Sequence, residues 1–172
     1  LAIHALHKLK SLPLEARPQL IIAGGYDERL HENRRVFQEL KDLVQRLELE
    51  QSVYFIKSFT DRLKYLLLSA VVGVVYTPPD EHFGIVPLES MAFERPVVAC
   101  GSGGPLESVL DGETGFLADP TAESFASCMQ KLMASDNANP RQMGKAGRQH
   151  VEENFSRAIF GQKLVEWLTD LV

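Results

Sequence analysis

The 172-residue sequence predicts an α/β fold in which a parallel sheet is covered by helices on both faces. Short apolar runs alternate along the chain with segments of helical periodicity. The runs lack the polar–apolar alternation of half-exposed strands, which indicates strands buried on both faces. Crossover connections between parallel strands are right-handed. These observations together predict a Rossmann-like domain, in which ligands bind at the carboxyl ends of the strands.

Five short apolar runs are the predicted strands. They are residues 19–23, 53–56, 71–77, 96–100 and a short run around 115–117. Glycines or prolines stop three of them: Gly24-Gly25 after the first, Pro78-Pro79 after the third and residues 101–105 after the fourth. The loops that follow the strands are therefore the places to look for function.

The helical segments lie between the runs. We predict helices at residues 2–12, 31–49, 61–70 and 84–93, a short one after Pro105, one from Thr121 to about 135, one from about Pro140, and one from Ser156 to about 171. In the second, an apolar stripe forms one face of an amphipathic helix. In the last, Trp167 belongs to an apolar stripe that we expect to pack in the core or against another domain, with contact with a membrane surface as the alternative.

Length and composition bound the class of protein. The chain has the length of one domain and carries 23 acidic against 18 basic residues, a formal charge of −5. This balance argues against a general nucleic-acid binder. The longest uncharged stretch, residues 65–79, is shorter than the roughly 20 residues of a membrane helix, so we expect no transmembrane segment here. The sequence begins at Leu1 inside a predicted helix, and we expect it to be part of a longer protein.

The loop after the third strand carries the clearest chemistry. Glu81 and Glu89 lie eight residues apart around a predicted helix start. Unpaired amides at residues 83–86 would suit a phosphate, and Gly84 would let a ligand approach the backbone. Glu89 would then face a ribose diol, and Glu81 would face donors on a sugar.

The two glutamates allow two other interpretations. A glycosidase pair is disfavoured, because eight helical residues span about 12 Å, whereas such carboxyl groups lie about 5–9.5 Å apart. The second alternative is two ordinary solvated acids.

The remaining loops give weaker signals. Gly24 and Gly25 could line the same crevice or simply form a turn, and Ser58 and Phe59 could flank a nucleobase. The glycine-rich turn at residues 101–105 is either a tight turn or a place where backbone reaches a ligand. His82 is a candidate for positioning the sugar. The two cysteines show no C-x-x-C spacing and are predicted to be reduced, buried thiols.

Three ordered motifs resemble family 4 retaining glycosyltransferases of GT-B fold. They are Glu81 to Glu89 with His-Phe-Gly-Ile-Val-Pro-Leu between, Gly-Gly-Pro-Leu-Glu at residues 103–107, and Asp-Gly-Glu-Thr-Gly-Phe at residues 111–116. Residues 23–29, followed by Glu32-Asn33, resemble the eukaryotic mannosyltransferases of this family that extend the dolichol-linked N-glycan precursor. The resemblance implies the donor-binding, C-terminal half of a GT-B glycosyltransferase.

The resemblance also implies the chemistry. The donor would be GDP-mannose and the acceptor a dolichyl-diphosphate-linked oligosaccharide, on the cytosolic face of the endoplasmic reticulum. Glu81 would be catalytic and contact the mannosyl ring, and Glu89 would bind the ribose hydroxyls. The donor sugar and phosphate would be held by backbone amides, those of Phe83, Gly84, Ile85 and Val86. No cofactor and no metal are expected.

One departure from the family concerns the diphosphate. The family places an Arg and a Lys after the first strand of this domain, and both should precede Leu1. We therefore expect residues 1–172 to be an N-terminally truncated donor domain without the acceptor domain, which alone binds GDP weakly and transfers nothing. The alternatives are another nucleotide sugar as donor, or a non-catalytic nucleotide-binding module on the same fold.

Overall fold

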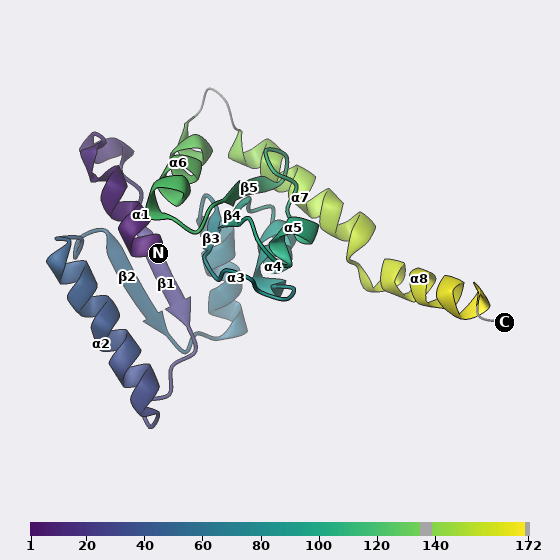
Figure 1. Cartoon of the computed structure of the whole chain (residues 1–172), viewed down its shortest axis with the longest axis horizontal. Coiled ribbons are helices and arrows are strands. Elements are labelled where there is room, and N and C mark those ends of the chain that lie inside the picture. Colours follow the sequence, from purple (N-terminus) through teal and green to yellow (C-terminus); the bar gives the residue numbers. More distant parts are fainter. Residues whose placement is uncertain (135–138, 171–172) are drawn as a thin grey trace.

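The computed structural model describes residues 1–134 and 139–170 (Figure 1). Its five strands are β1 (Leu20–Gly24), β2 (Val53–Lys57), β3 (Val74–Tyr76), β4 (Val97–Cys100) and β5 (Gly115–Ala118). Its α-helices in the described ranges are α1 (Ala2–Lys8), α2 (His31–Arg46), α3 (Asp61–Ala70), α4 (Ile85–Ala92), α5 (Pro105–Ser108), α6 (Ala122–Met133), α7 (Pro140–Asn154) and α8 (Arg157–Asp170). The α/β class predicted from the alternating pattern is confirmed.

The strands form two parallel sheets rather than one. β1 pairs with β2, Leu20 opposite Val53, and β3, β4 and β5 form a second sheet in that order. The expectation of one sheet is wrong for this structure, because within the described residues β1 and β3 each pair along only one edge.

The three-stranded sheet has an apolar core on each face. Val98 and Cys100 of β4 join the core under α1 and α6, whereas Val97 and Ala99 join the core under α4. This split follows from the strand period of two, which sends neighbouring side chains to opposite faces. All four β4 side chains are fully buried, as the unbroken apolar run predicts.

Helix α1 ties the two sheets into one body. It packs along α6, and its buried face, Ile3, Ala5 and Leu6, shares a core with Val53 of β2 and Val98 of β4. Figure 1 shows α1 at the upper end of the β1–β2 pair, beside α6. The two sheets therefore keep a fixed relation although their strands do not pair.

The expectation that strands are buried on both faces is wrong for β1 and β2. Ile21 of β1 and Tyr54 of β2 are exposed, as is Ala23. Leu20 and Ile22 pack against the core. The strand period of two sends Ile21 and Ala23 to the opposite face, where Tyr54 of β2 lies beside Ile21. One face of the β1–β2 sheet therefore packs on the core, while the other face is largely exposed.

Most element boundaries agree with the sequence to within a few residues. Thr60 caps α3 by accepting a hydrogen bond from the Leu63 amide, as its residue type predicts. The predicted strand at 71–77 is shorter, and the first helix continues beyond Lys8 as a 3₁₀ turn. The predicted helix ends near 135 and 171 lie outside the described residues.

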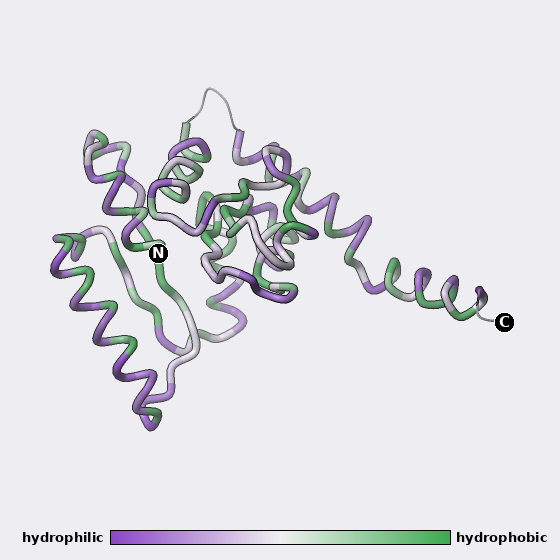
Figure 2. Tube along the Cα trace, in the orientation of Figure 1, coloured by the Kyte–Doolittle hydropathy of each residue, from purple (hydrophilic) through white to green (hydrophobic). Residues whose placement is uncertain are grey.

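Helix α8 extends away from the body (Figure 1). Figure 2 shows hydrophobic positions along it, and the Trp167 side chain is 70% exposed. The expectation that this stripe packs in the core is therefore wrong, while its packing against another domain stays a prediction. Both cysteines are free and buried, as predicted. Over residues 1–134 and 139–170 no helix is both long and apolar enough to cross a membrane.

Candidate functional site

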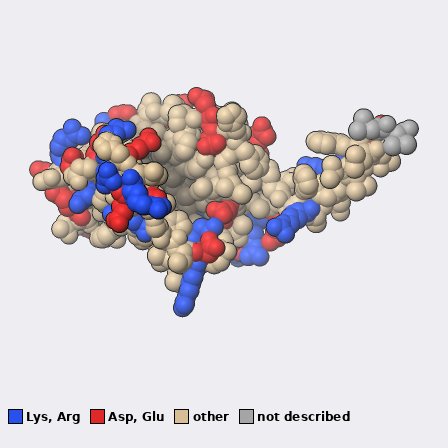
Figure 3. Space-filling view, turned by 90° about the horizontal axis from the view of Figure 1, so that it is seen from below, with Lys and Arg blue, Asp and Glu red and all other residues tan. Residues whose placement is uncertain are grey.

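The candidate site lies where the strands end. In Figure 1 the arrowheads of β1 and β2 point to the lower side of the molecule, and Figure 3 views it from there. The space-filling view shows a hollow between the left end of the molecule, where charged side chains gather, and the larger body. The carboxyl edge of a parallel sheet is where α/β proteins bind ligands.

The start of α4 presents free backbone amides. Gly84 precedes the helix with a φ of +74°, a conformation that favours glycine, and no side chain caps the helix start. The Tyr76 ring lies so close beneath that a Cβ on Gly84 would stand 3.0 Å from it. Ile85 and Val86 are exposed at this end. The first amides of a helix lack intrahelical partners, so this end can hold an anion.

Glu81 is held by its own loop. Its carboxylate accepts a hydrogen bond from the His82 amide at 3.1 Å. Burial raises the pKa of Tyr76, and the neighbouring Glu81 carboxylate adds to the rise. Glu81 is half-buried, whereas the side chains of His82 and Phe83 are exposed. This places Glu81 between the end of β3 and the start of α4, with its carboxylate partly accessible.

The glycine-rich turn packs directly on this loop. A Cβ on Gly103 would overlap the Glu81 carbonyl oxygen, and one on Gly104 would overlap the backbone of Phe83. The Gly104 amide donates to the Glu81 carbonyl at 2.7 Å, and the Asp80 amide donates to the Ser102 hydroxyl at 3.0 Å. The sequence left open why the turn is rich in glycine. The structure gives a reason: the backbone of one loop lies against that of the other.

Glu89 lies on α4 and is paired with a lysine. The Lys64 ammonium of α3 donates to its Oε1 at 2.9 Å, and this hydrogen bond raises the pKa of Lys64. Lys64 also lies 3.9 Å from Asp61. Sequence reasoning missed this pair, since the two residues are 25 positions apart and no local pattern joins them.

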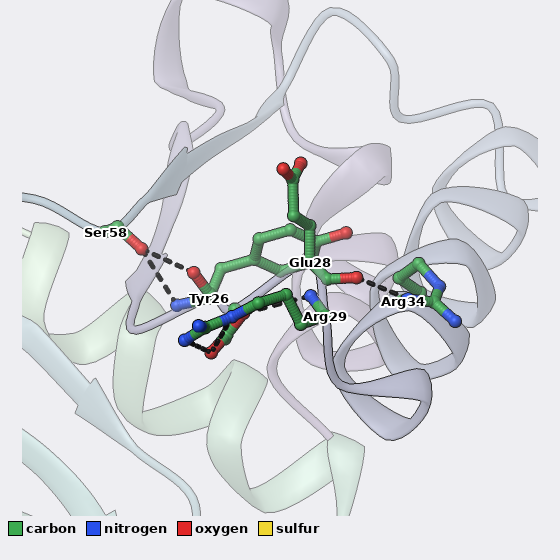
Figure 4. A network of polar contacts seen from close by, with 6 residues as sticks. Tyr26, Glu28, Arg29, Arg34 and Ser58 are labelled. Carbon is green, nitrogen blue, oxygen red and sulfur yellow. Dashed lines mark hydrogen bonds and ion pairs between the residues drawn. The ribbon is translucent and has the colours of Figure 1, made fainter.

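Ser58 braces the loop after β1. Its hydroxyl donates to the Tyr26 carbonyl at 2.7 Å and accepts from the Tyr26 amide at 3.1 Å (Figure 4). A Cβ on Gly24 or Gly25 would meet nothing within 4 Å, so packing inside the chain does not require these glycines. Phe59, beside Ser58, is half-buried.

An aromatic and charged cluster surrounds this loop, and sequence reasoning missed it too. The Lys57 ammonium lies 4.1 Å from the centre of the Tyr26 ring and 4.2 Å from that of Phe37. Beyond it, Arg29 holds the Asp27 carboxylate at 2.7 Å and lowers its pKa, and Arg34 donates to the Glu28 carbonyl (Figure 4). These contacts fix the loop that follows β1.

Two sets of predicted site residues thus emerge. One set surrounds the start of α4, namely Glu81, His82, Phe83, Gly84, Ile85, Val86 and Glu89; the other lies at the carboxyl ends of β1 and β2, namely Gly24, Gly25, Ser58 and Phe59. Their roles toward a ligand stay predictions. Within the described ranges no group of three or more His, Cys, Asp or Glu side chains could hold a metal ion.

Comparison with known proteins independently identifies the family. Residues 1–150 match the family model described as glycosyl transferases group 1. The chain belongs to this family. The expected family resemblance and the GT-B type of fold are therefore confirmed.

Curated members of the group 1 family are close in sequence. The chain is 46% identical over 156 residues to the alpha-1,3/1,6-mannosyltransferase ALG2 of Homo sapiens, and 43% identical over 175 residues to that of Mus musculus. The matches cover 91% and 100% of this chain but 37% and 42% of the relatives. The chain thus spans about two fifths of the length of these relatives.

Solved glycosyltransferases share the fold. Sucrose-phosphate synthase from Thermosynechococcus elongatus superposes with a TM-score of 0.81 at 29% identity, covering 99% of this chain and 42% of that one. Anabaena Alr3699/HepE in complex with UDP gives 0.81 at 27% identity, covering 98% and 44%. The C-terminal domain of the group 1 protein LpcC from Francisella tularensis gives 0.74 at 25% identity, covering 90% and 77%.

Proposed function

We propose that this chain is the donor-binding domain of a retaining mannosyltransferase. The whole protein would move mannose from GDP-mannose to a dolichyl-diphosphate-linked oligosaccharide in N-glycan precursor synthesis, on the cytosolic face of the endoplasmic reticulum. The mannosyltransferase names of relatives at 43–46% identity support the reaction class. The observation that carries the donor role is the uncapped start of α4, bracketed by Glu81 and Glu89.

Each part of the donor has a matching group in this segment. The amides at the start of α4 suit the diphosphate, since a helix N-terminus favours negative charge. A carboxylate such as that of Glu89 accepts hydrogen bonds from a ribose diol. Glu81, at the loop beside that helix start, would accept from the sugar hydroxyls, with His82 as its neighbour. Catalysis would then consist of positioning the donor and stabilising the charge on the leaving diphosphate. No metal ion or cofactor enters the proposal.

The split sheet supports a further part of the proposal, that this is an N-terminally truncated domain. Doubly wound sheets often have the strand order 3-2-1-4-5-6. The observed orders, β1-β2 and β3-β4-β5, fit the two outer parts of that arrangement with its central strand missing. We propose that a strand preceding Leu1, with the diphosphate-binding basic residues after it, joins the two sheets. The acceptor site would belong to the remaining part of the longer protein.

Calorimetry with the 172-residue chain tests the donor role. We expect GDP and GDP-mannose to bind weakly, with a Kd on the order of 0.1 mM, because the proposed basic residues lie outside the chain. No mannosyl transfer is expected. Absence of any nucleotide binding would contradict the donor role. Binding in the nanomolar range would instead contradict the proposal that basic residues outside the chain matter.

A uracil nucleotide sugar is a second candidate donor, because one of the structural neighbours binds such nucleotides. The Anabaena protein of known structure is in complex with UDP, and in a further structure with UDP-glucose. The same titrations with UDP and UDP-glucose distinguish the candidates. Tighter binding of the guanine nucleotides supports GDP-mannose, and tighter binding of the uracil nucleotides supports another member of the family. A non-catalytic nucleotide-binding module would bind nucleotide, but the longer protein would show no transfer.

A further inference from the structure

The contact between Lys64 and Glu89 links two helices at the candidate donor site. Lys64 lies in the first turns of α3, which Thr60 caps, and Glu89 lies in the middle of α4. The ammonium and Oε1 are 2.9 Å apart, the short distance expected of a hydrogen bond between charged groups. Both side chains are only partly exposed, 26% for Lys64 and 38% for Glu89. The pair is thus better shielded than the other surface ion pairs of the described chain.

A second contact keeps the helices in register. The ring of Tyr65, next to Lys64, stacks on Phe93 at the end of α4, with ring centres 5.2 Å apart and planes 21° apart. The cap of α3 and the aromatic stack thus fix the residues on either side of Lys64, and the Lys64 ammonium lies 5.7 Å from the centre of the Tyr65 ring. A lysine side chain loses much entropy when it is fixed, and this packing reduces that loss on forming the ion pair.

The pair leaves half of the Glu89 carboxylate available. Lys64 uses Oε1, and among the described residues no hydrogen bond reaches Oε2. A carboxylate has two oxygens that can each accept hydrogen bonds. The lysine also neutralises a negative charge that would otherwise stand close to an anionic nucleotide.

We propose that Lys64 is a positioning residue that holds Glu89 in the orientation in which its second oxygen receives the ribose hydroxyls of the donor. This inference rests on the proposed function, since it deepens the role given there to Glu89. Lys64 itself touches no substrate in this scheme. It acts through the carboxylate, so its effect depends on the presence of the ribose hydroxyls.

The test compares two nucleotides and three variants of the chain. GDP and 2′,3′-dideoxy-GDP are titrated into the wild type, Lys64→Met and Lys64→Arg. We expect Lys64→Met to weaken GDP binding by about tenfold, within the range of coupling between residues in contact. Binding of the dideoxy nucleotide should change less than twofold, and Lys64→Arg should restore most of the GDP affinity. Thermal unfolding of each variant shows that the fold is retained.

A matched control removes a cation from an ion pair elsewhere. Arg35 pairs with Glu39 at 2.8 Å on the exposed side of α2, and Arg35→Met should leave both affinities unchanged. Equal weakening of both nucleotides by Lys64→Met, or no weakening of either, would overturn the inference while leaving the donor role in place. If the wild-type chain binds no nucleotide, the proposed function fails, and this inference with it.

Discussion

Gly104→Ala is expected to destabilise the chain strongly and to abolish nucleotide binding. The added methyl group would overlap the backbone of Phe83, and backbone atoms cannot yield as the end of a flexible side chain can. Forcing atoms into a packed contact costs about 1–3 kcal/mol or more. The Gly104 amide would also lose its 2.7 Å bond to the Glu81 carbonyl. Urea unfolding followed by circular dichroism measures the loss of stability, and calorimetry with GDP measures the loss of binding.

The matched control is Gly161→Ala in α8. A Cβ there meets nothing within 4 Å, and alanine is favoured over glycine in a helix, so stability should stay the same or rise slightly. Gly104→Ala behaving like Gly161→Ala in both measurements would show that the glycine turn does not fix the loop of Glu81.

Glu89→Gln is expected to weaken nucleotide binding by about 10- to 100-fold, the value of losing a hydrogen bond to a charged group. The amide keeps the shape of the side chain, so the fold should survive. The Lys64 partner loses its counter-charge, but it is partly exposed and water can solvate it. Nuclear magnetic resonance titration is suited to the weak binding of the variant.

The corresponding control is Glu39→Gln, which breaks the exposed pair with Arg35 on α2. It should leave GDP affinity within twofold of the wild type. If Glu89→Gln binds GDP as well as Glu39→Gln does, Glu89 does not contact the ribose, and the assignment of the donor site to α4 loses its main support.

The sequence predicted the fold where local pattern and tertiary burial agree. The run that became β4 is apolar at every position, and all four residues are buried between two cores. The same reasoning was wrong for Ile21 of β1, which is exposed because it lies on the face of the β1–β2 sheet opposite the core that Leu20 and Ile22 join. An apolar strand pattern indicates what a chain can bury, whereas actual burial of each face needs another layer packed against that face.

The residues of the candidate site come from local features of the sequence and their roles stay predictions, whereas their contacts with one another could not be predicted. The spacing of Glu81 and Glu89 and the glycine at the helix start are local features, and they pointed to the start of α4. The ion pair of Lys64 with Glu89 joins positions 25 apart, and the close approach of Gly104 to the backbone of Phe83 depends on how two loops meet. Such contacts arise from the tertiary fold and leave no periodic signal in the sequence.

The most direct test of the central claim is a crystal structure of the chain soaked with GDP-mannose. The donor should lie over the start of α4, with its diphosphate at the amides of Gly84 to Val86, its ribose at Glu89 and its mannose near Glu81. A donor bound elsewhere, for example against the loop of Tyr26 and Arg29 with the start of α4 untouched, would contradict the assignment.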